Sequence, residues 1–344
     1  MTDSELRKLI ISGSPIPDML ADDVLDEGEA TSETELRHLS VPVEGHASRL
    51  DKALAGLVPE FSRSYLQQLI EAGAVLVKGR AALKTSLKVK AGDDLTIELR
   101  PTPQSQAFKP EEMALNIVYQ DDHLLVINKP AGLVVHPAPG NWSGTLLNGL
   151  LAYDQQAACL PRAGIVHRLD KDTSGLMVVA RQRRTMDALV GMIAARTVSR
   201  EYIALAHGSW VGAKSCQVEA PIGRDPRNRL RMAVVDLGKN SGKTASTVIS
   251  LLESSAKHCL VKCKLHTGRT HQIRVHMAFL GHALVADVLY GGAMEHGLQR
   301  QGLHACRLAF EHPETGTPME FRSAPAQDLQ EAMTSLGLRY NLAL

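Results

Sequence analysis

Hydrophobic positions recur at helical spacing in an early part of the chain. Leu50, Leu54 and Leu57 fall on one face of a helix, and Ser62 can cap a second helix directly after it. The run that follows, AVLVKGRAALKTSLKVKAGDDLTIEL, consists of short apolar and polar stretches broken by glycines, which is typical of strands. We therefore predict a small αα–β domain over residues 41–100.

Three other segments lack such a pattern. Residues 1–40 mix Ser, Thr, Pro and acidic residues without periodicity, and we expect a disordered extension. Residues 101–112 are polar and contain three prolines, which predicts a linker. Residues 331–344 are expected to form a C-terminal tail.

A second domain is predicted over residues 113–330. The runs NIVYQDDHLLVINKP, GLMVVAR, REYIALAHG, STVISLLE and CLVKCKL have the length and composition of strands. Helical patterns occur at residues 182–197 and again from Gln327. Because strands follow one another with few helices between them, we expect an α+β fold with a mixed, mainly antiparallel sheet.

The composition is that of a globular protein, with 44% hydrophobic and 22% charged residues. No apolar run reaches the roughly 18 residues of a membrane span, and the N-terminus does not resemble a secretory signal, so we expect a cytoplasmic protein. The five cysteines form no CxxC pair, which predicts reduced, buried side chains.

The net charge of +1 conceals an asymmetry. Residues 1–36 carry ten acidic and two basic residues, a net charge of −8, which leaves +9 for the rest of the chain. This distribution favours a partner that is a polyanion, although an acidic tail can also serve solubility alone. Five basic residues and no acid lie between Lys78 and Lys90, where a solvated face is an equally good interpretation.

The segment GIVHRLDKDTSGLMVVA, residues 164–180, contains the first candidate site. Its polar residues lie between two apolar runs, so they are expected in a loop held by rigid strands. Asp172 and Ser174 are readily explained as turn residues that bind backbone groups. Asp170 is the residue for which we predict a chemical role.

A second candidate lies in KLHTGRTHQIRVHM, residues 264–277. Arg274 stands between the apolar residues Ile273 and Val275, and we interpret this segment as a buried strand that follows a polar loop. A buried arginine needs a carboxylate partner because burial of an unpaired charge is costly. Charge complementarity indicates an acid such as Asp170.

Two other patterns are set aside. The run GKNSGKT, residues 238–244, has three residues between its glycines where a phosphate-binding loop needs four, and strand-like residues follow it. His266, His271 and His276 are spaced by five residues, which suits neither face of a helix nor one face of a strand. We therefore expect no metal site and no nucleotide site.

Several ordered motifs together are similar to the RluA/RluD family of pseudouridine synthases. They are HRLDKDTSG, the sequence REY at residues 200–202, LHTGRTHQIRVHM, and DxxYGG at residues 287–292, and the similarity runs from about Leu115 to Ala326. The αα–β domain, with its VLVKGR hairpin, resembles the S4 RNA-binding domain.

This resemblance implies a pseudouridine synthase fold behind an S4-like domain, and catalytic roles for Asp170, Tyr202 and Arg274. The implied reaction cleaves the N1–C1′ bond of a uridine and rejoins the base through C5, which needs no cofactor. An ionised carboxylate can act as nucleophile or base in such a reaction. Tyr202 can stack on the uracil and its hydroxyl group can assist proton removal at C5, and the alternative for this residue is simple packing in the core.

The resemblance also implies large-subunit (23S) ribosomal RNA as the partner, either free or in an assembling ribosomal subunit, and we expect a monomer. A target base must leave its stack, so a uridine in a loop is the natural substrate, and Arg168 resembles the residue that fills the vacated space. The residues expected to contact RNA are Arg63, Lys78, Arg80, Lys84, His167, Arg168, Arg269 and His271.

Two other classes of function remain open from the residues alone. An inactive relative would bind ribosomal RNA through the S4-like face without catalysis, although Asp170 and Arg274 are both present. A glycoside hydrolase would use Asp170 and Asp172 as its pair of carboxylates. Side chains two residues apart in an extended loop tend to diverge, which argues against that pair.

Overall fold

The computed structural model describes residues 35–59, 61–99, 107–138, 141–228 and 231–340. The chain divides into two compact units, Met1–Ala107 and Phe108–Leu344. Each unit is described separately.

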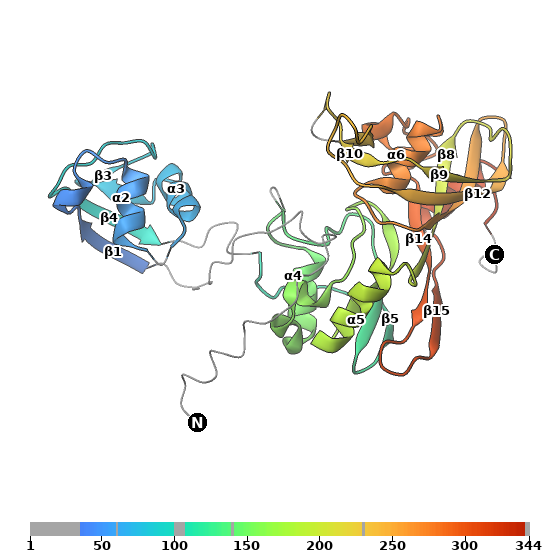
Figure 1. The fold of residues 1–344 in the computed structure, drawn as a ribbon, viewed down its shortest axis with the longest axis horizontal. Helices are drawn as coiled ribbons and strands as arrows, with labels where there is room; N and C mark the ends of the chain where they lie inside the picture. Colours follow the sequence, from blue (N-terminus) through green and yellow to red (C-terminus); the bar gives the residue numbers. More distant parts are fainter. Residues whose placement is uncertain (1–34, 60, 100–106, 139–140, 229–230, 341–344) are drawn as a thin grey trace. The chain divides into compact units, whose positions relative to one another are not determined.

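The first unit is a four-stranded antiparallel sheet with two helices against it (Figure 1). Leu54 of one helix and Ile70 of the other are fully buried with Ile97 of the sheet in one hydrophobic cluster. The strands lie in the order β1-β4-β2-β3. The elements are β1 (Glu35–Ser40), η2 (Val43–Gly45), α2 (Leu50–Leu57), α3 (Arg63–Glu71), β2 (Val75–Val77), β3 (Arg80–Ala81) and β4 (Asp94–Leu99).

Local sequence explains the ends of these elements. The Ser62 hydroxyl accepts a hydrogen bond from the backbone N–H of Tyr65, so the predicted cap of α3 is present. Lys78 and Gly79 both have a positive φ, 53° and 74°, which is the geometry of a tight hairpin turn between β2 and β3.

The structure contradicts the expected boundary at residue 40. The sequence predicts a disordered extension through residue 40, but residues 35–40 form β1 and pair with β4 along its whole length. The strand lies at the edge of the sheet and Leu36 is 57% exposed, so its sequence carries little of the buried apolar pattern that predicts a strand. Residues 1–34 lie outside the described part of the chain.

The second unit is built on a nine-stranded sheet with the order β5-β6-β7-β14-β8-β13-β12-β9, and β15 pairs with β14. Only the pair β7–β14 is parallel among the described strands, so the expected mixed, mainly antiparallel sheet is confirmed. The strands of this unit are β5 (Ile117–Gln120), β6 (Leu124–Lys129), β7 (Ser174–Ala180), β8 (Ser199–His207), β9 (Ser215–Glu219), β10 (Ile222–Arg224), β11 (Met232–Val234), β12 (Ser246–Ser254), β13 (His258–Leu265), β14 (Leu303–Glu311) and β15 (Pro318–Arg322). The helices are α4 (Leu146–Tyr153), η4 (Gln155–Cys159), η5 (Pro161–Gly164), α5 (Arg183–Ala194), α6 (Gln272–Phe279), η6 (Val288–Tyr290) and α7 (Gln327–Ser335).

Helices bury the sheet through separate hydrophobic clusters. Leu146 of α4 packs with Met177 of β7, whereas Leu189 of α5 packs with Val178, the next residue of the same strand. Because neighbouring side chains of a strand point to opposite faces, α4 and α5 cover opposite sides of β7. Both faces of this strand are therefore closed to solvent.

The expectation of a C-terminal tail from residue 331 is wrong for its first part. The helix α7 continues to Ser335, and Met333 and Leu338 are buried in a cluster with Ile203 of β8. The apolar residues of this segment bury their surface against the sheet, which outweighs the entropy of a free tail.

The cysteines only partly follow expectation. Cys259, Cys263 and Cys306 are buried, but Cys159 is exposed and Cys216 is half-buried, and all five are free thiols. Among the described residues, no helix is long and apolar enough to cross a membrane.

Candidate active site

Asp170 lies in the loop that precedes β7, and its side chain is 17% exposed. Lys129, the last residue of β6, holds this loop in place. The Lys129 ammonium group donates hydrogen bonds of 2.9 Å to the carbonyl oxygens of Pro130, Leu133 and Lys171. Burial lowers the pKa of Lys129 to about 8, against the opposing effect of nearby Asp172 and Asp170.

The far end of this loop is fixed by residues that precede and begin β14. Arg300 donates to the carbonyl oxygen of Asp172 at 2.9 Å, and the Ser174 hydroxyl lies 2.9 Å from His304 Nδ1. Both residues stabilise the loop, but the contacts differ from the expected side-chain bonds to backbone groups: Asp172 uses its backbone carbonyl, and Ser174 contacts side chains. Gly175 allows the close approach of β14, since a Cβ atom there would lie 2.3 Å from the carbonyl oxygen of Ala305.

Arg274 lies on α6, and the expectation of a strand for this segment is wrong. The helix buries Gln272, Ile273, Arg274, Val275, His276 and Met277. The polar residues of this helix are buried together with the apolar ones. Of the two ring nitrogens of His276, for example, one is hydrogen-bonded to the Thr247 hydroxyl and the other to the carbonyl oxygen of Ala220. The alternation therefore resembles a strand although the backbone is helical.

The Arg274 guanidinium group joins two carboxylates. Nε and Nη2 donate to the two oxygens of Asp287 at 2.7 and 2.8 Å, while Nη1 donates to Asp170 Oδ2 at 3.2 Å. The Arg274 Cζ atom lies 5.0 Å from the centre of the Tyr290 ring. Burial acts to lower the pKa of Arg274, but the two carboxylates outweigh it and raise the pKa above its usual value. The expected pairing of Asp170 with Arg274 is present.

His271 approaches the other oxygen of Asp170. Its Nδ1 lies 2.8 Å from the Tyr290 hydroxyl and its Nε2 lies 4.0 Å from Asp170 Oδ1. The Tyr290 oxygen accepts the N–H of Met232, and its own O–H can donate to His271 Nδ1 when the ring proton of His271 is on Nε2, which faces Asp170. Burial lowers the pKa of His271, so the neutral ring is favoured.

Tyr202 lies on β8 and is 5% exposed. It packs in the hydrophobic cluster that contains Leu169, next to Asp170 in the chain, so it is both a core residue and a neighbour of the site. Burial, with a smaller effect of Asp170, raises the pKa of Tyr202 to about 12. The hydroxyl group is therefore protonated at neutral pH.

Arg200, two residues before Tyr202, was not singled out from the sequence except as part of the REY motif. Its side chain is buried, and its Nε has no hydrogen-bond partner among the described residues. A Cβ atom at Gly268 would lie 2.9 Å from Arg200 Nη1, so this glycine leaves space for the guanidinium group.

The expected RNA contacts in this unit differ in their surroundings. The His167 ring accepts the N–H of Val178 through Nε2, and burial together with Arg200 lowers its pKa to about 3, which describes a neutral ring that supports β7. Arg269 donates through Nε to the carbonyl oxygen of Thr244 at 3.1 Å. Arg168 is exposed.

In the first unit, the expected RNA-contacting residues are partly engaged with acids. Asp51 is fully buried and accepts hydrogen bonds from Arg63 at 2.7 Å and from Arg49 at 3.0 Å, which hold its pKa well below the usual range. Lys78 forms an ion pair of 2.7 Å with Asp93 and is 63% exposed. Arg80 and Lys84 are exposed.

Sequence reasoning missed Lys129, Asp287 and Tyr290 as parts of the site. A signal was present for two of them, since both lie in the motif DxxYGG that carried the resemblance. A lone lysine at the end of an apolar strand offers no comparable signal. The assembled site presents a partly exposed carboxylate beside a fixed guanidinium group, which is suited to nucleophilic or base catalysis.

Two family models match the chain. One, described as RNA pseudouridylate synthase, matches residues 123–279, and the other, described as S4 domain, matches residues 48–95. Both ranges fall in the units where the corresponding motifs were identified.

Curated relatives are similar over most of the chain. A protein of Neisseria meningitidis serogroup B named Ribosomal large subunit pseudouridine synthase D is 47% identical over 325 residues, which cover 91% of this chain and 85% of the relative. A protein of the same name from Xanthomonas campestris pv. campestris is 44% identical over 324 residues, with coverages of 90% and 96%. A Bacillus subtilis protein named Uncharacterized RNA pseudouridine synthase YlyB is 42% identical over 296 residues, with coverages of 85% and 95%.

Among solved structures, one named Human RNA Pseudouridylate Synthase Domain Containing 4 superposes with a TM-score of 0.54. It is 22% identical and covers 65% of this chain and 94% of the human chain. At this identity the likeness is one of fold, and it confirms the fold expected for the second unit.

Proposed function

The chain belongs to the RNA pseudouridylate synthase family and carries an S4 domain, and on this basis we propose that it modifies uridines of large-subunit ribosomal RNA with Asp170 as its catalytic residue. The reaction is an isomerisation in which the N1–C1′ bond breaks, the base turns, C5 bonds to C1′, and the C5 proton moves to N1 through the medium. The enzyme class is that of the family. The RNA and the catalytic residue are our proposals.

The observation that carries the assignment of Asp170 is its contact with Arg274. The 3.2 Å hydrogen bond from Arg274 orients the Asp170 carboxylate, and the bidentate Asp287–Arg274 pair fixes the direction from which the guanidinium group approaches. The Asp170 side chain is 17% exposed, so a substrate atom can reach it. A charged carboxylate that is accessible and held in one orientation can attack the sugar or the uracil ring, or remove a proton.

We assign to Tyr202 the role of a ring on which the uracil stacks. A pKa of about 12 keeps its hydroxyl group neutral, which suits a hydrogen-bond donor better than a base at neutral pH. The Asp170 carboxylate is then better suited to remove the C5 proton, once it is no longer bonded to the sugar or to the uracil ring.

RNA binding is assigned to both units. Unstacking a base costs a few kcal/mol, and this cost is smallest for a uridine in a loop or single strand. The exposed Arg168, near Asp170 in the chain, can contact the position that the base leaves. Lys78, Arg80 and Lys84 of the S4 domain are exposed and can contact phosphates. A cytoplasmic location, a monomeric state and an assembling ribosomal subunit as substrate stay predictions.

The test is turnover on a transcript of large-subunit ribosomal RNA that carries tritium at uridine C5. Formation of pseudouridine releases that tritium, so the wild-type chain should release it, and Asp170→Asn should release none while its Kd for the transcript stays within about twofold. The matched control is Asp187→Asn, because Asp187 is also an aspartate paired with an arginine but is 60% exposed. Release by Asp170→Asn at the wild-type rate would contradict the assignment, and no release by the wild type would favour the interpretation as a binding protein only.

A further inference from the structure

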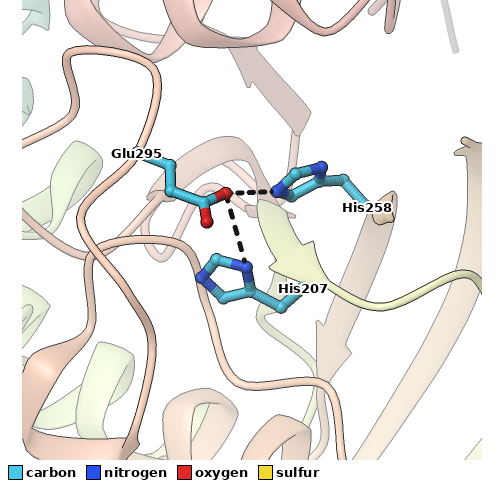
Figure 2. A group of neighbouring side chains, drawn as sticks. All are labelled: His207, His258 and Glu295. Atoms are coloured by element: carbon cyan, nitrogen blue, oxygen red, sulfur yellow. Dashed lines mark hydrogen bonds and ion pairs between the residues drawn. The ribbon is translucent and has the colours of Figure 1, made fainter. Parts of the chain in front are cut away.

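Three side chains with metal-ligand chemistry meet at a place that the proposed function does not use. They are His207 at the end of β8, His258 at the start of β13, and Glu295 in the loop between η6 and β14 (Figure 2). Their ligand atoms all lie within 4.8 Å of one another.

The register of the sheet places the two histidines side by side. His207 and His258 are direct partners in the antiparallel pair β8–β13, so their side chains leave the same face with Cβ atoms about 5 Å apart. Glu295 then approaches from the loop and directs one carboxylate oxygen at both rings (Figure 2). That oxygen lies 2.8 Å from His258 Nε2 and 3.9 Å from His207 Nδ1.

These separations are near those of a tetrahedral zinc site. With bonds of about 2.0–2.1 Å, the ligand atoms of such a site lie about 3.4 Å apart. Rotation of the exposed Glu295 carboxylate can lengthen the 2.8 Å contact and shorten the 3.9 Å contact, each by about half an ångström, and the two ring nitrogens lie within 4.8 Å of each other. Two imidazoles and a carboxylate are also a common ligand set for zinc, with a fourth position left for water.

The backbone near the cluster allows two tautomers of His207. Its Nε2 accepts the N–H of Ala293 at 3.1 Å in one tautomer, and it lies 3.3 Å from the carbonyl oxygen of the same residue, to which it can donate in the other. When Nε2 carries the proton and donates to that carbonyl, the lone pair of Nδ1 faces Glu295. A hydrogen bond from the second ring nitrogen is the usual way in which proteins orient a histidine that binds metal.

An ion from solvent can reach the cluster. The side chains of His207 and Glu295 are 23% and 41% exposed, whereas that of His258 is 6% exposed. The buried ring provides a fixed ligand, and the two exposed side chains leave room for the ion and its water. By contrast, both nitrogens of His276, a residue of the histidine series set aside above, already contact protein atoms.

We propose that His207, His258 and Glu295 bind one divalent transition ion of the zinc class, and that the ion attaches the loop after η6 to the ends of β8 and β13. This differs from the expectation of no metal, which rested on other histidines. The role is structural, because none of the three residues contacts Asp170 or Arg274 in the described structure. The loop that it fixes follows directly after η6, whose Tyr290 packs against Arg274.

Zinc chloride is the probe for the experiment, with the full-length chain stripped by a chelator under reducing conditions. Competition with a chromophoric chelator should give one ion per chain, and Co²⁺ should show the visible absorption of a tetrahedral nitrogen and oxygen site. Glu295→Gln and His207→Asn should each weaken the affinity at least tenfold, because each removes one of three protein ligands. The Tm of the wild type should rise by a few degrees with zinc, and that rise should disappear in both variants.

His38→Asn is the matched control, because His38 is an exposed histidine of the first unit that contacts Thr96, and this variant should bind zinc as the wild type does. Glu295→Gln keeps a side chain that can accept the hydrogen bond of His258, so folding can be checked by circular dichroism before titration. The proposal is overturned if no stoichiometric ion binds, if both variants bind as tightly as the wild type, or if Co²⁺ shows thiolate bands from the cysteines. None of these readouts depends on pseudouridine formation.

Discussion

The substitution Asp287→Asn tests whether Arg274 is positioned by its second carboxylate. Asp287 is 1% exposed at its side chain and accepts two hydrogen bonds from Arg274, at 2.7 and 2.8 Å. Asparagine has nearly the same shape but keeps only one oxygen, and it turns an NH₂ group toward the guanidinium group. One charge-assisted hydrogen bond is lost, and among the described residues Arg274 retains only Asp170 as an intact carboxylate partner.

The expected cost follows from burial. A hydrogen bond to a charged group contributes about 1.5–3 kcal/mol, and complete removal of one partner from a buried ion pair costs about 3–5 kcal/mol. Because Asp170 still compensates part of the charge and asparagine keeps one acceptor, we expect the free energy of unfolding to fall by about 2–3 kcal/mol. Displacement of Arg274 should also disturb Asp170, and we expect kcat to fall on the order of 100-fold with little change in the Kd for RNA.

Urea unfolding followed by tryptophan fluorescence isolates this effect, since both tryptophans, Trp142 and Trp210, belong to the second unit. Glu320→Gln is the control, because Glu320 also pairs with arginines, at 2.6 and 2.8 Å, but is 42% exposed. Its effect should be within about 1 kcal/mol. If Asp287→Asn unfolds and turns over like the wild type, the positioning of Arg274 does not depend on Asp287 and the account of the site is refuted.

Three further predictions concern other parts of the chain. Burial lowers the pKa of His304 to about 4 from 6.5, so the unfolded chain binds the proton first as the pH falls, and His304 alone should contribute about 2 kcal/mol to the loss of unfolding free energy of the second unit between pH 7 and pH 5. Urea unfolding at both pH values should show a smaller loss in His304→Asn, and an equal loss would remove this residue as a cause. Deletion through residue 40 should lower the Tm of the first unit relative to deletion through residue 34, because residues 35–40 form β1, and identical calorimetric transitions would contradict a stabilising role of that strand. Reversal of charge at Lys78, Arg80 and Lys84 should weaken RNA binding and reduce its dependence on salt, and a filter-binding series that matches the wild type at every salt concentration would exclude this face.

The sequence permits prediction of the site where chemistry alone restricts the choice. An arginine between apolar residues requires a buried carboxylate, and this reasoning correctly paired Arg274 with Asp170. It did not identify Asp287, which takes the stronger, bidentate contact, because many acids can satisfy the same requirement. Only the fold decides which of them lies within reach.

The secondary structure of the same segment shows where pattern analysis fails. The alternation of Ile273 and Val275 with Arg274 predicts a strand, yet the segment is a helix buried on nearly all sides. Hydrophobic periodicity reports burial only when polar residues face solvent, and here Arg274 and His276 are buried with partners from other elements. The edge strand β1 was not predicted for the opposite reason: its apolar residue Leu36 faces solvent, so the strand lacks a buried apolar pattern.

Pseudouridine mapping in cells tests the central proposal most directly. Large-subunit ribosomal RNA would be mapped from cells that lack this protein, and from the same cells that express either the wild type or Asp170→Asn at equal levels. We predict that specific uridines lose their modification, that the wild type restores it, and that Asp170→Asn does not. Restoration by Asp170→Asn would contradict the catalytic assignment, and an unchanged map would contradict large-subunit ribosomal RNA as the substrate.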